Sequence, residues 1–370
     1  MNNQLLFDPA VFIVGENYEI IFVTKNKGVG FIKIGEIEYY DTNCGIVRSE
    51  SKIHKVYIPK SELDTAKEYT VCYAYMAVHE CYYAKNDPPI EKTYKFIPVP
   101  EDKMPEIAFI SDTHSAIDPP AACADAMHFD LLILGGDLSN SSDTEDEIFC
   151  LYRLAQKITH GNLPIVYARG NHDNRGRMAE HLTDYIPTDN GNTFYTFEAG
   201  KLEGIVLDCG EDKPDFCIEY GMTADYVSFR QKQTNFLRKL KISNPNPGDK
   251  RRIAICHIAF TRSNADCVAF MSEIYKEWIN ILSDIGIDLL ISGHFHETAV
   301  LANGGCGWID AMPDFTTVIG ATANDDPKNN REWHPDEFCA SHYSFDEDRL
   351  CIEFLNSKGN LCFSESINLN

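Results

Sequence analysis

The 370-residue chain has no long hydrophobic run and no regularly spaced cysteine pair. The missing hydrophobic run excludes a membrane-spanning helix, which needs about 20 consecutive apolar residues. The first 20 residues have neither a basic start nor a small-residue cleavage site, so we expect no secretory signal and a cytoplasmic protein. The 13 cysteines include no CxxC pair, which is typical of reduced thiols in a chain that folds without disulfides.

Basic residues are scarce, because 33 lysines and arginines stand against 56 aspartates and glutamates, a net charge of −23. A surface this acidic repels phosphate backbones and anionic lipids, so we exclude long nucleic acids and membrane surfaces as partners. The charge is also uneven: residues 1–104 carry 15 acidic and 12 basic side chains, and residues 105–370 carry 41 and 21. With 44% hydrophobic residues, the chain still has enough apolar side chains to form a core.

The hydrophobic pattern changes near residue 100. Before it, short runs rich in β-branched and aromatic residues alternate with turn-like clusters, and no segment has a convincing helical period. This spacing predicts a small all-β sandwich over residues 1–100. The segment IPVPEDKMP, with three prolines in nine residues, is predicted to be a linker.

After residue 105, apolar runs such as EIAFIS, FDLLILGG and RRIAICHIAF alternate with helix-like stretches. The predicted helices cover residues 144–159, 224–241 and 268–283, and KGN at residues 358–360 is a predicted hairpin turn. Alternating strands and helices predict an α/β domain over residues 105–370, with helices on both faces of a central sheet.

Five of the predicted strands end in a side chain that can bind a metal. Because ligands of open α/β sheets bind beyond the carboxyl ends of the strands, we expect these side chains to meet. In chain order, they are Asp112 and His114, Asp137, Asn171 with His172 and Asp173, His257, and finally His294 and His296.

The donor types in this set predict a two-metal centre. Carboxylate and amide oxygens combined with imidazole nitrogens suit Mn, Fe, Zn, Co or Ni better than an all-oxygen Mg or Ca site. Seven ligands are too many for one ion, so two ions sharing one carboxylate are expected. If the segment from His294 to His296 is extended, both imidazoles share a face and one can serve each ion.

The motifs Asp-x-His, Gly-Asp, Gly-Asn-His-Asp, His and Gly-His-x-His, in this order, resemble the calcineurin-like metallophosphoesterase superfamily over residues 106–320. The resemblance implies a two-sheet αββα sandwich and a metal-bridging hydroxide that attacks phosphorus. It also implies that His172 protonates the leaving oxygen or binds a phosphoryl oxygen, while Asp173 orients its ring. One metal would be held by Asp112, His114, Asp137 and His296, and the other by Asp137, Asn171, His257 and His294.

The subfamily is less clear from the sequence. The N-terminal segment is similar to the fibronectin-III-like domain of purple acid phosphatases, but His114 and Asn140 replace the glycine and the metal-binding tyrosine of that group. The arginine that phosphoprotein phosphatases carry shortly after the second motif is missing from residues 138–142. Arg175, just after the third motif, is a candidate for contact with the substrate phosphate.

We therefore expect a metal-dependent phosphomonoesterase that acts on small or peptide-borne phosphate esters. A phosphodiesterase acting on cyclic nucleotides or other small diesters is the alternative, and a non-catalytic interaction scaffold on the same fold is a second one. The irregular segments 208–226 and 321–339 are expected to be either pocket-forming loops or solvated surface excursions.

Overall fold

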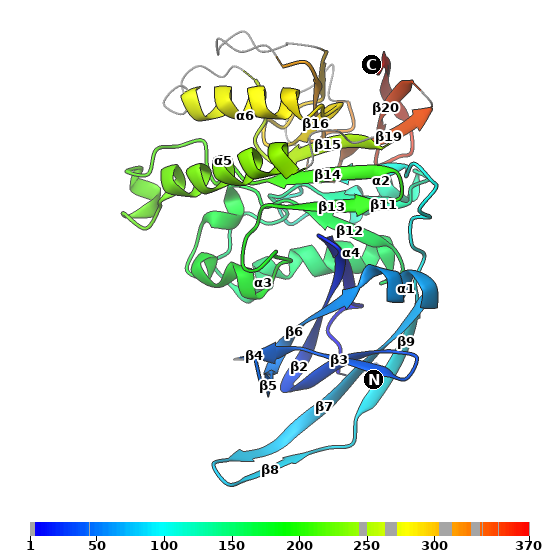
Figure 1. Ribbon diagram of the computed structural model, residues 1–370, viewed down its shortest axis with the longest axis vertical. Coiled ribbons are helices and arrows are strands. Elements are labelled where there is room, and N and C mark those ends of the chain that lie inside the picture. The colour runs from blue at the N-terminus through cyan, green and yellow to red at the C-terminus, as the bar shows by residue number, and fades with distance from the viewer. Residues whose placement is uncertain are drawn as a thin grey trace.

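Two stacked β-sheets form the centre of the molecule (Figure 1). The computed structural model describes residues 4–43, 45–243, 250–262, 272–302, 313–326, 334, 336–346 and 348–369. Helices α5 (Tyr226–Ser243) and α6 (Ser272–Asp284) pack on one sheet, and α2 (Asp118–Asp125) and α4 (Cys150–Thr159) contact the other. This arrangement confirms the predicted α/β class and the two-sheet sandwich.

Among the described residues, the larger sheet has 13 strands. Its main path runs β21 (Leu361–Asn368), β20 (Arg349–Asn356), β19 (Cys339–Asp346), β10 (Ile107–Ile110), β11 (Leu131–Leu134), β12 (Pro164–Tyr167), β1 (Ala10–Val14), β2 (Asn17–Ile34), β7 (Glu68–Glu80) and β8 (Tyr83–Asn86). Strands β3 (Ile37–Tyr40) and β6 (Glu50–Pro59) pair with β2, and β9 (Ile90–Lys95) pairs with β7. A separate two-stranded ribbon joins β4 (Thr42–Asn43) to β5 (Val47–Arg48).

The smaller sheet has six strands, in the order β13 (Tyr195–Ala199), β14 (Leu202–Leu207), β15 (Arg251–Cys256), β16 (Leu289–Ser292), β18 (Thr316–Ile319) and β17 (Ala299–Leu301). Side chains of β15 alternate between two cores. Ile253 and Ile255 pack between the sheets, whereas Ala254 and Cys256 pack under α5 and α6. Because successive side chains of a strand point to opposite faces, a strand buried on both sides reads as the continuous apolar run seen in the sequence.

Two of the predicted helices lie close to their expected places. Residues 144–159 form α3 (Glu145–Ile148) and α4, and Thr144 caps α3 with a capping box to Glu147. Residues 224–241 correspond to α5. The third prediction, 268–283, corresponds to α6, but its first four residues lie outside the described residues.

The N-terminal strands are continuous with the rest of the fold. Strand β1 pairs in parallel with β12, with Val11 opposite Pro164 and Phe12 opposite Ile165. The strands of residues 1–100 therefore extend the large sheet, and their side chains share its hydrophobic core. Residues 1–100 are mainly strands, as predicted, but they also contain a short helix that was not expected, and the expected separate sandwich does not describe how the strands pair. In Figure 1 this region reaches away from the stacked sheets and ends in the β7–β8 hairpin. Helix α1 (Lys60–Ala66) connects β6 to β7.

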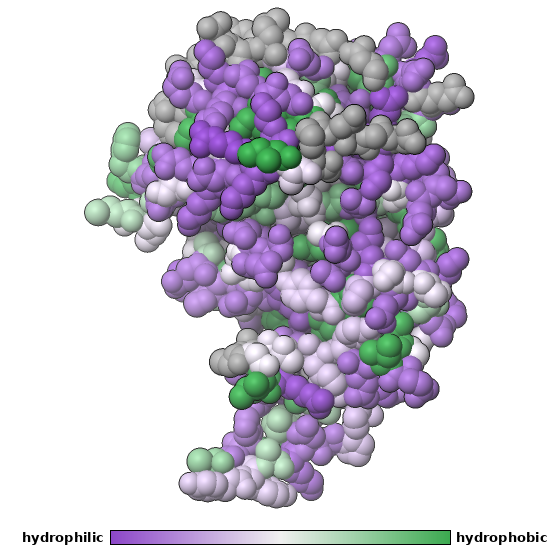
Figure 2. Space-filling view, in the orientation of Figure 1, coloured by the Kyte–Doolittle hydropathy of each residue, from purple (hydrophilic) through white to green (hydrophobic). Residues whose placement is uncertain are grey.

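Residues 96–106 contain no helix or strand, as expected of a linker, and β20 and β21 form the predicted hairpin, with Gly359 at φ 76° in its turn. Segment 321–339 falls partly outside the described residues. The face shown in Figure 2 is mostly hydrophilic. Among the described helices, none combines the length and the apolar character needed to cross a membrane.

Candidate metal centre

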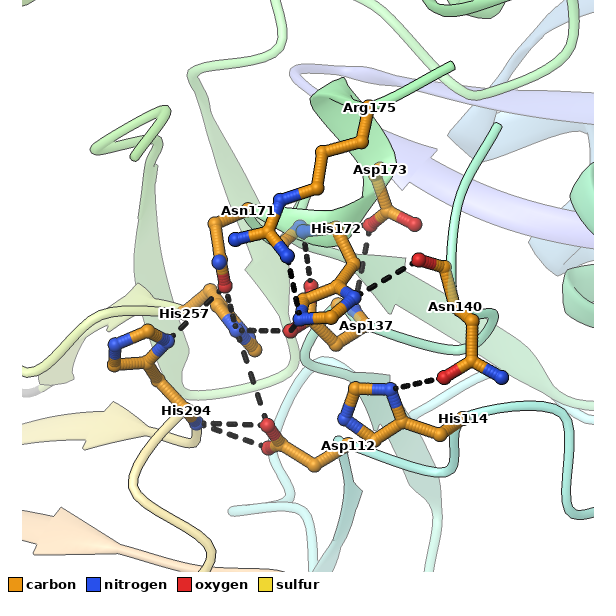
Figure 3. Close-up of polar contacts among 12 residues, drawn as sticks. Asp112, His114, Asp137, Asn140, Asn171, His172, Asp173, Arg175, His257 and His294 are labelled. Carbon is orange, nitrogen blue, oxygen red and sulfur yellow. Dashed lines mark hydrogen bonds and ion pairs between the residues drawn. The ribbon is translucent and has the colours of Figure 1, made fainter. Parts of the chain in front are cut away.

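The predicted metal-binding side chains meet at one edge of the two stacked sheets (Figure 3). Strands β10, β11 and β12 are parallel in the large sheet, and β14, β15, β16 and β18 are parallel in the small one. The loops that leave the carboxyl ends of five of these strands carry the side chains, as the rule for open sheets predicts. All nine residues named in the sequence analysis as metal-binding or catalytic lie in these loops, between residues 112 and 296.

Five of these residues have left-handed backbone conformations, which are uncommon outside glycine and concentrate at functional sites. They are Asp112, His114, Asp137, His294 and His296, with φ between 43° and 70°. The segment from His294 to His296 is therefore not extended, so the expected alternation of side chains is wrong. Gly293 allows the close approach of this loop, because a methyl group there would overlap the Asp112 carboxylate.

The first group of donors contains Asp112, His114 and His296. The two Nε2 atoms of His114 and His296 are 3.2 Å apart, and Asp112 Oδ1 lies 3.7 Å from His296 Nε2. The Asp112 carboxylate is fully buried, and it accepts hydrogen bonds from the His294 amide at 3.0 Å. Two ligands of one metal at about 2.1 Å each are about 3.0–3.4 Å apart, so the imidazole spacing fits a shared cation.

The second group contains Asp137, His257, His294 and the amide of Asn171. His257 Nε2 lies 3.1 Å from Asp137 Oδ2 and 3.2 Å from Asn171 Oδ1. His294 Nδ1 lies 3.0 Å from the same Asn171 oxygen. His294 and His296 are two residues apart, yet each belongs to a different group of donors. One histidine for each ion was the expectation from the sequence, although it assumed an extended segment.

Hydrogen bonds on the far side of each ligand fix which ring nitrogen faces the centre. His257 Nδ1 donates to the Gly135 carbonyl at 2.7 Å, and His114 Nδ1 donates to Asn140 Oδ1 at 3.0 Å. In the neutral form of each ring, the Nε2 lone pair therefore points toward the centre. The Asn171 amide donates to Glu211 Oε1 at 3.1 Å, which turns its oxygen inward. In that form the lone pairs face one another at about 3 Å, an arrangement that a cation between them stabilises in place of a proton.

The electrostatics of the buried centre also favour a cation. Burial opposes ionisation of Asp137, but the His257 and His172 imidazoles lower its pKa below the usual carboxyl range. Burial likewise opposes protonation of His257, yet Asp137 and Asp112 raise its pKa to about 10. A field that raises the pKa of a buried imidazole this far stabilises positive charge, which a metal ion would supply.

His172 lies at the rim of the centre in a short 3-10 helix, His172–Asn174. Its Nδ1 donates to the Asn140 carbonyl at 2.9 Å, and its Nε2 faces Arg175 Nη1 at 3.1 Å. Nε2 is also 3.9 Å from Asp137 Oδ2. The ring is therefore held by Asn140 and Arg175.

The predicted role of Asp173 in orienting the His172 ring is wrong. The Asp173 carboxylate is buried and accepts hydrogen bonds from the Gly170 amide at 2.8 Å and the Tyr167 hydroxyl at 2.9 Å. It turns away from the His172 imidazole because these donors and the Asp137 amide surround it. Asp173 instead fixes the loop that carries Asn171.

Sequence reasoning missed three residues that support the centre: Asn140, Glu211 and Asp212. Glu211 is fully buried, and its Oε2 accepts from Arg175 Nη2 at 2.8 Å and from the Tyr220 hydroxyl. Asp212 Oδ2 lies 3.0 Å from His294 Nε2, so it holds the ring whose Nδ1 faces the centre. For Glu211 and Asp212, the signal in the sequence is the acidic run DCGED, which directly follows a strand at the start of the 208–226 segment.

Substituting Asp212 with alanine is expected to weaken metal binding by about 10–100-fold, because a carboxylate behind a histidine ligand orients the ring and increases its basicity. Metal titration of the purified variant measures the effect. Asp225→Ala is the matched control, since Asp225 belongs to the same segment but is exposed. Equal affinities in the two variants would contradict the assigned role of Asp212.

Comparisons with known proteins agree with the motif order. The family model of calcineurin-like phosphoesterases matches residues 105–298. No curated protein sequence matches the chain. A dimetal phosphatase from Danio rerio is 12% identical, with 74% of this chain and 100% of that chain covered and a TM-score of 0.48.

Two solved structures of Vps29 are also similar. A single mutant from Entamoeba histolytica is 12% identical, with 72% and 99% covered and a TM-score of 0.32. The Chaetomium thermophilum protein is 10% identical, with 72% and 98% covered and a TM-score of 0.31. The family match, which spans more than half of the 370 residues, is the decisive comparison. With it, the chain belongs to the calcineurin-like phosphoesterase family and is a metal-dependent hydrolase of phosphate esters.

Proposed function

We propose that the chain is a phosphomonoesterase that uses two metal ions and acts on small or peptide-borne phosphates. The observation that carries the proposal is the position of Asp137, whose carboxylate lies close to His257 and His294 and also to His114, a member of the first donor group. The mixed nitrogen and oxygen donors fit Mn, Fe, Zn, Co or Ni. The proposed ligands are Asp112, His114, Asp137 and His296 for one ion, and Asp137, Asn171, His257 and His294 for the other.

When bound, such ions lower the pKa of water and stabilise the charge that develops on the phosphoryl oxygens. The chain itself orients its ligands through Gly135, Asn140, Glu211 and Asp212 and limits their access to water by burial. This preorganisation means that little reorientation of dipoles is needed when the substrate reacts.

Arg175 and His172 would complete the reaction at the rim. A monoester carries more negative charge than a diester, and the Arg175 guanidinium beside the centre matches that charge. We infer that a phosphoryl oxygen takes the Arg175 Nη1 donor from His172, which frees Nε2 to bind a proton from solvent. His172 then passes this proton to the leaving alkoxide while Nδ1 stays bonded to the Asn140 carbonyl.

The decisive experiment measures metal content by mass spectrometry and compares hydrolysis of phenyl phosphate and diphenyl phosphate. We expect two metal ions per chain and a kcat/KM at least about tenfold higher for the monoester. A reversed preference would make the chain a phosphodiesterase. No turnover of either ester with any of the five metals would overturn the proposal.

A further inference from the structure

A cavity of about 920 Å³ borders the candidate centre on the side of Arg175. Arg175 lines this cavity, and its Nη1 lies 3.1 Å from His172 Nε2. In the proposed reaction, His172 contacts the leaving oxygen of the ester. The cavity therefore begins where the leaving group extends away from the scissile phosphate.

The less exposed part of the cavity lining is cationic and aromatic. It contains the side chains of Arg169, Asn174, Arg175, Tyr220, Tyr226 and Phe229. The one partly buried acid of the lining, Asp143, is engaged by Arg177 through its backbone amide at 3.0 Å and its guanidinium at 2.7 Å. The other acids of the lining are exposed. The lining as a whole has four basic and four acidic side chains, but Arg169 and Arg175 are less exposed than three of the four acids.

Arg169 is held rigidly from behind. Its Nε donates to Asp208 Oδ2 at 2.7 Å, and its guanidinium lies 5.3 Å from the centre of the Phe229 ring. Asp208 is fully buried and is itself fixed by the Thr193 hydroxyl at 2.6 Å and the Gly210 amide at 2.8 Å. Only 13% of the Arg169 side chain is exposed. The guanidinium therefore has one defined position at the wall.

The two terminal nitrogens of Arg169 have no hydrogen-bond partner among the described residues of the chain. Together they present parallel N–H donors, the geometry that binds a carboxylate or phosphate through two oxygens. Lys232, an exposed residue of the lining with no partner among the described residues, adds a further positive charge. Because Arg169 is largely shielded from water, its attraction for an anion is stronger than that of a surface arginine.

We propose that this cavity binds a second oxyanion, carried by the leaving group of the phosphate monoester, and that Arg169 determines this specificity. The inference rests on the proposed function, since it assigns the substrate class of the same centre: phosphate esters of acids or of compounds with another phosphate. The aromatic rings of Tyr226 and Phe229 would contact the carbon skeleton between the two anions.

The test compares three esters that differ only in one substituent: phenyl phosphate, 4-carboxyphenyl phosphate and 4-phosphonophenyl phosphate. We expect the wild-type chain to prefer at least one charged ester by about tenfold in kcat/KM, mainly through KM. The preferred substituent distinguishes carboxylate from phosphate recognition. Arg169→Gln is expected to abolish the preference. Arg169→Lys keeps a charge near Asp208 but loses the paired donors. This variant is therefore expected to lose most of the preference for the charged ester.

Arg238→Gln is the matched control, because that side chain is 55% exposed, is bound to Glu277 and does not line the cavity, so the preference should remain. Binding of the non-hydrolysable 4-carboxyphenylphosphonate and 4-phosphonophenylphosphonate relative to phenylphosphonate, measured by calorimetry, gives a readout that needs no turnover. The inference is overturned if the wild-type chain shows no preference among the esters or phosphonates. An equal loss in Arg169→Lys on charged and uncharged compounds also overturns it. Absence of ester hydrolysis with selective phosphonate binding would instead contradict the proposed function alone.

Discussion

Asp137→Asn is expected to lower kcat/KM for phosphate esters by at least about 10³-fold and to release bound metal. Asp137 is 1% exposed, and its Oδ2 lies 3.1 Å from His257 Nε2, while its Oδ1 accepts the His172 amide at 2.8 Å. It lies in one group of donors with His257 and His294, and in another with His114 and His172. Asparagine preserves the shape and can still accept a hydrogen bond, but it removes the charge that two cations would share.

Metal analysis and steady-state kinetics on the same preparation measure this effect, and Asp118→Asn is the control. Asp118 belongs to α2, its side chain is 82% exposed, and its partner is Lys157, so this substitution should change activity less than about twofold. Full metal content and activity within tenfold of wild type in Asp137→Asn would show that this carboxylate is not shared between two ions.

Most of the centre could be predicted from the sequence because its residues follow buried strands. The apolar runs before Asp112, Asp137 and His257 are unmistakable, and parallel strands bring their carboxyl ends to one edge. Side chains placed at such ends lie close together whatever the exact loop geometry. The structure accordingly brings the predicted donors within about 3–4 Å of one another.

The hydrogen bonds that orient these donors could not be predicted in the same way. Asn140, Glu211 and Asp212 lie in irregular loops, where no period relates a residue to the direction of its side chain. Asp173 illustrates the problem, because the family resemblance implied that its carboxylate orients the His172 ring. In a tight 3-10 turn, consecutive side chains point in different directions. The Asp173 carboxylate therefore faces the Gly170 amide and the Tyr167 hydroxyl.

Strand pairing in the N-terminal region escaped prediction for another reason. The apolar run of β1 satisfies the pattern of a strand in a small sandwich and of a strand in a large sheet equally well. Its parallel partner β12 lies about 150 residues away, and only the packing of the whole chain selects this pairing. A boundary near residue 100 therefore follows the change in sequence pattern, and whether residues 105–370 fold alone stays a prediction.

His172→Ala is expected to reduce kcat by about 10²–10³-fold while the metal content stays that of the wild-type chain, because the ring contacts the centre without being one of the proposed ligands. Comparing two leaving groups sharpens this test. Loss of a general acid slows the release of strongly basic phenoxide more than that of weakly basic 4-nitrophenoxide. The decrease in kcat should therefore be larger for phenyl phosphate than for 4-nitrophenyl phosphate.

His181→Ala is the matched control, since the His181 side chain is 56% exposed and forms ion pairs only with Glu180 and Asp184 among the described residues, and the substitution should leave both rates within about twofold. Two outcomes would contradict the role of His172. If the variant loses metal in proportion to activity, His172 is itself a metal ligand. The metal would then be held by the group of donors that contains His114, Asp137 and His172. If both esters slow equally with the metals retained, the ring binds a phosphoryl oxygen and does not protonate the leaving oxygen, because only proton donation depends on the basicity of the leaving group.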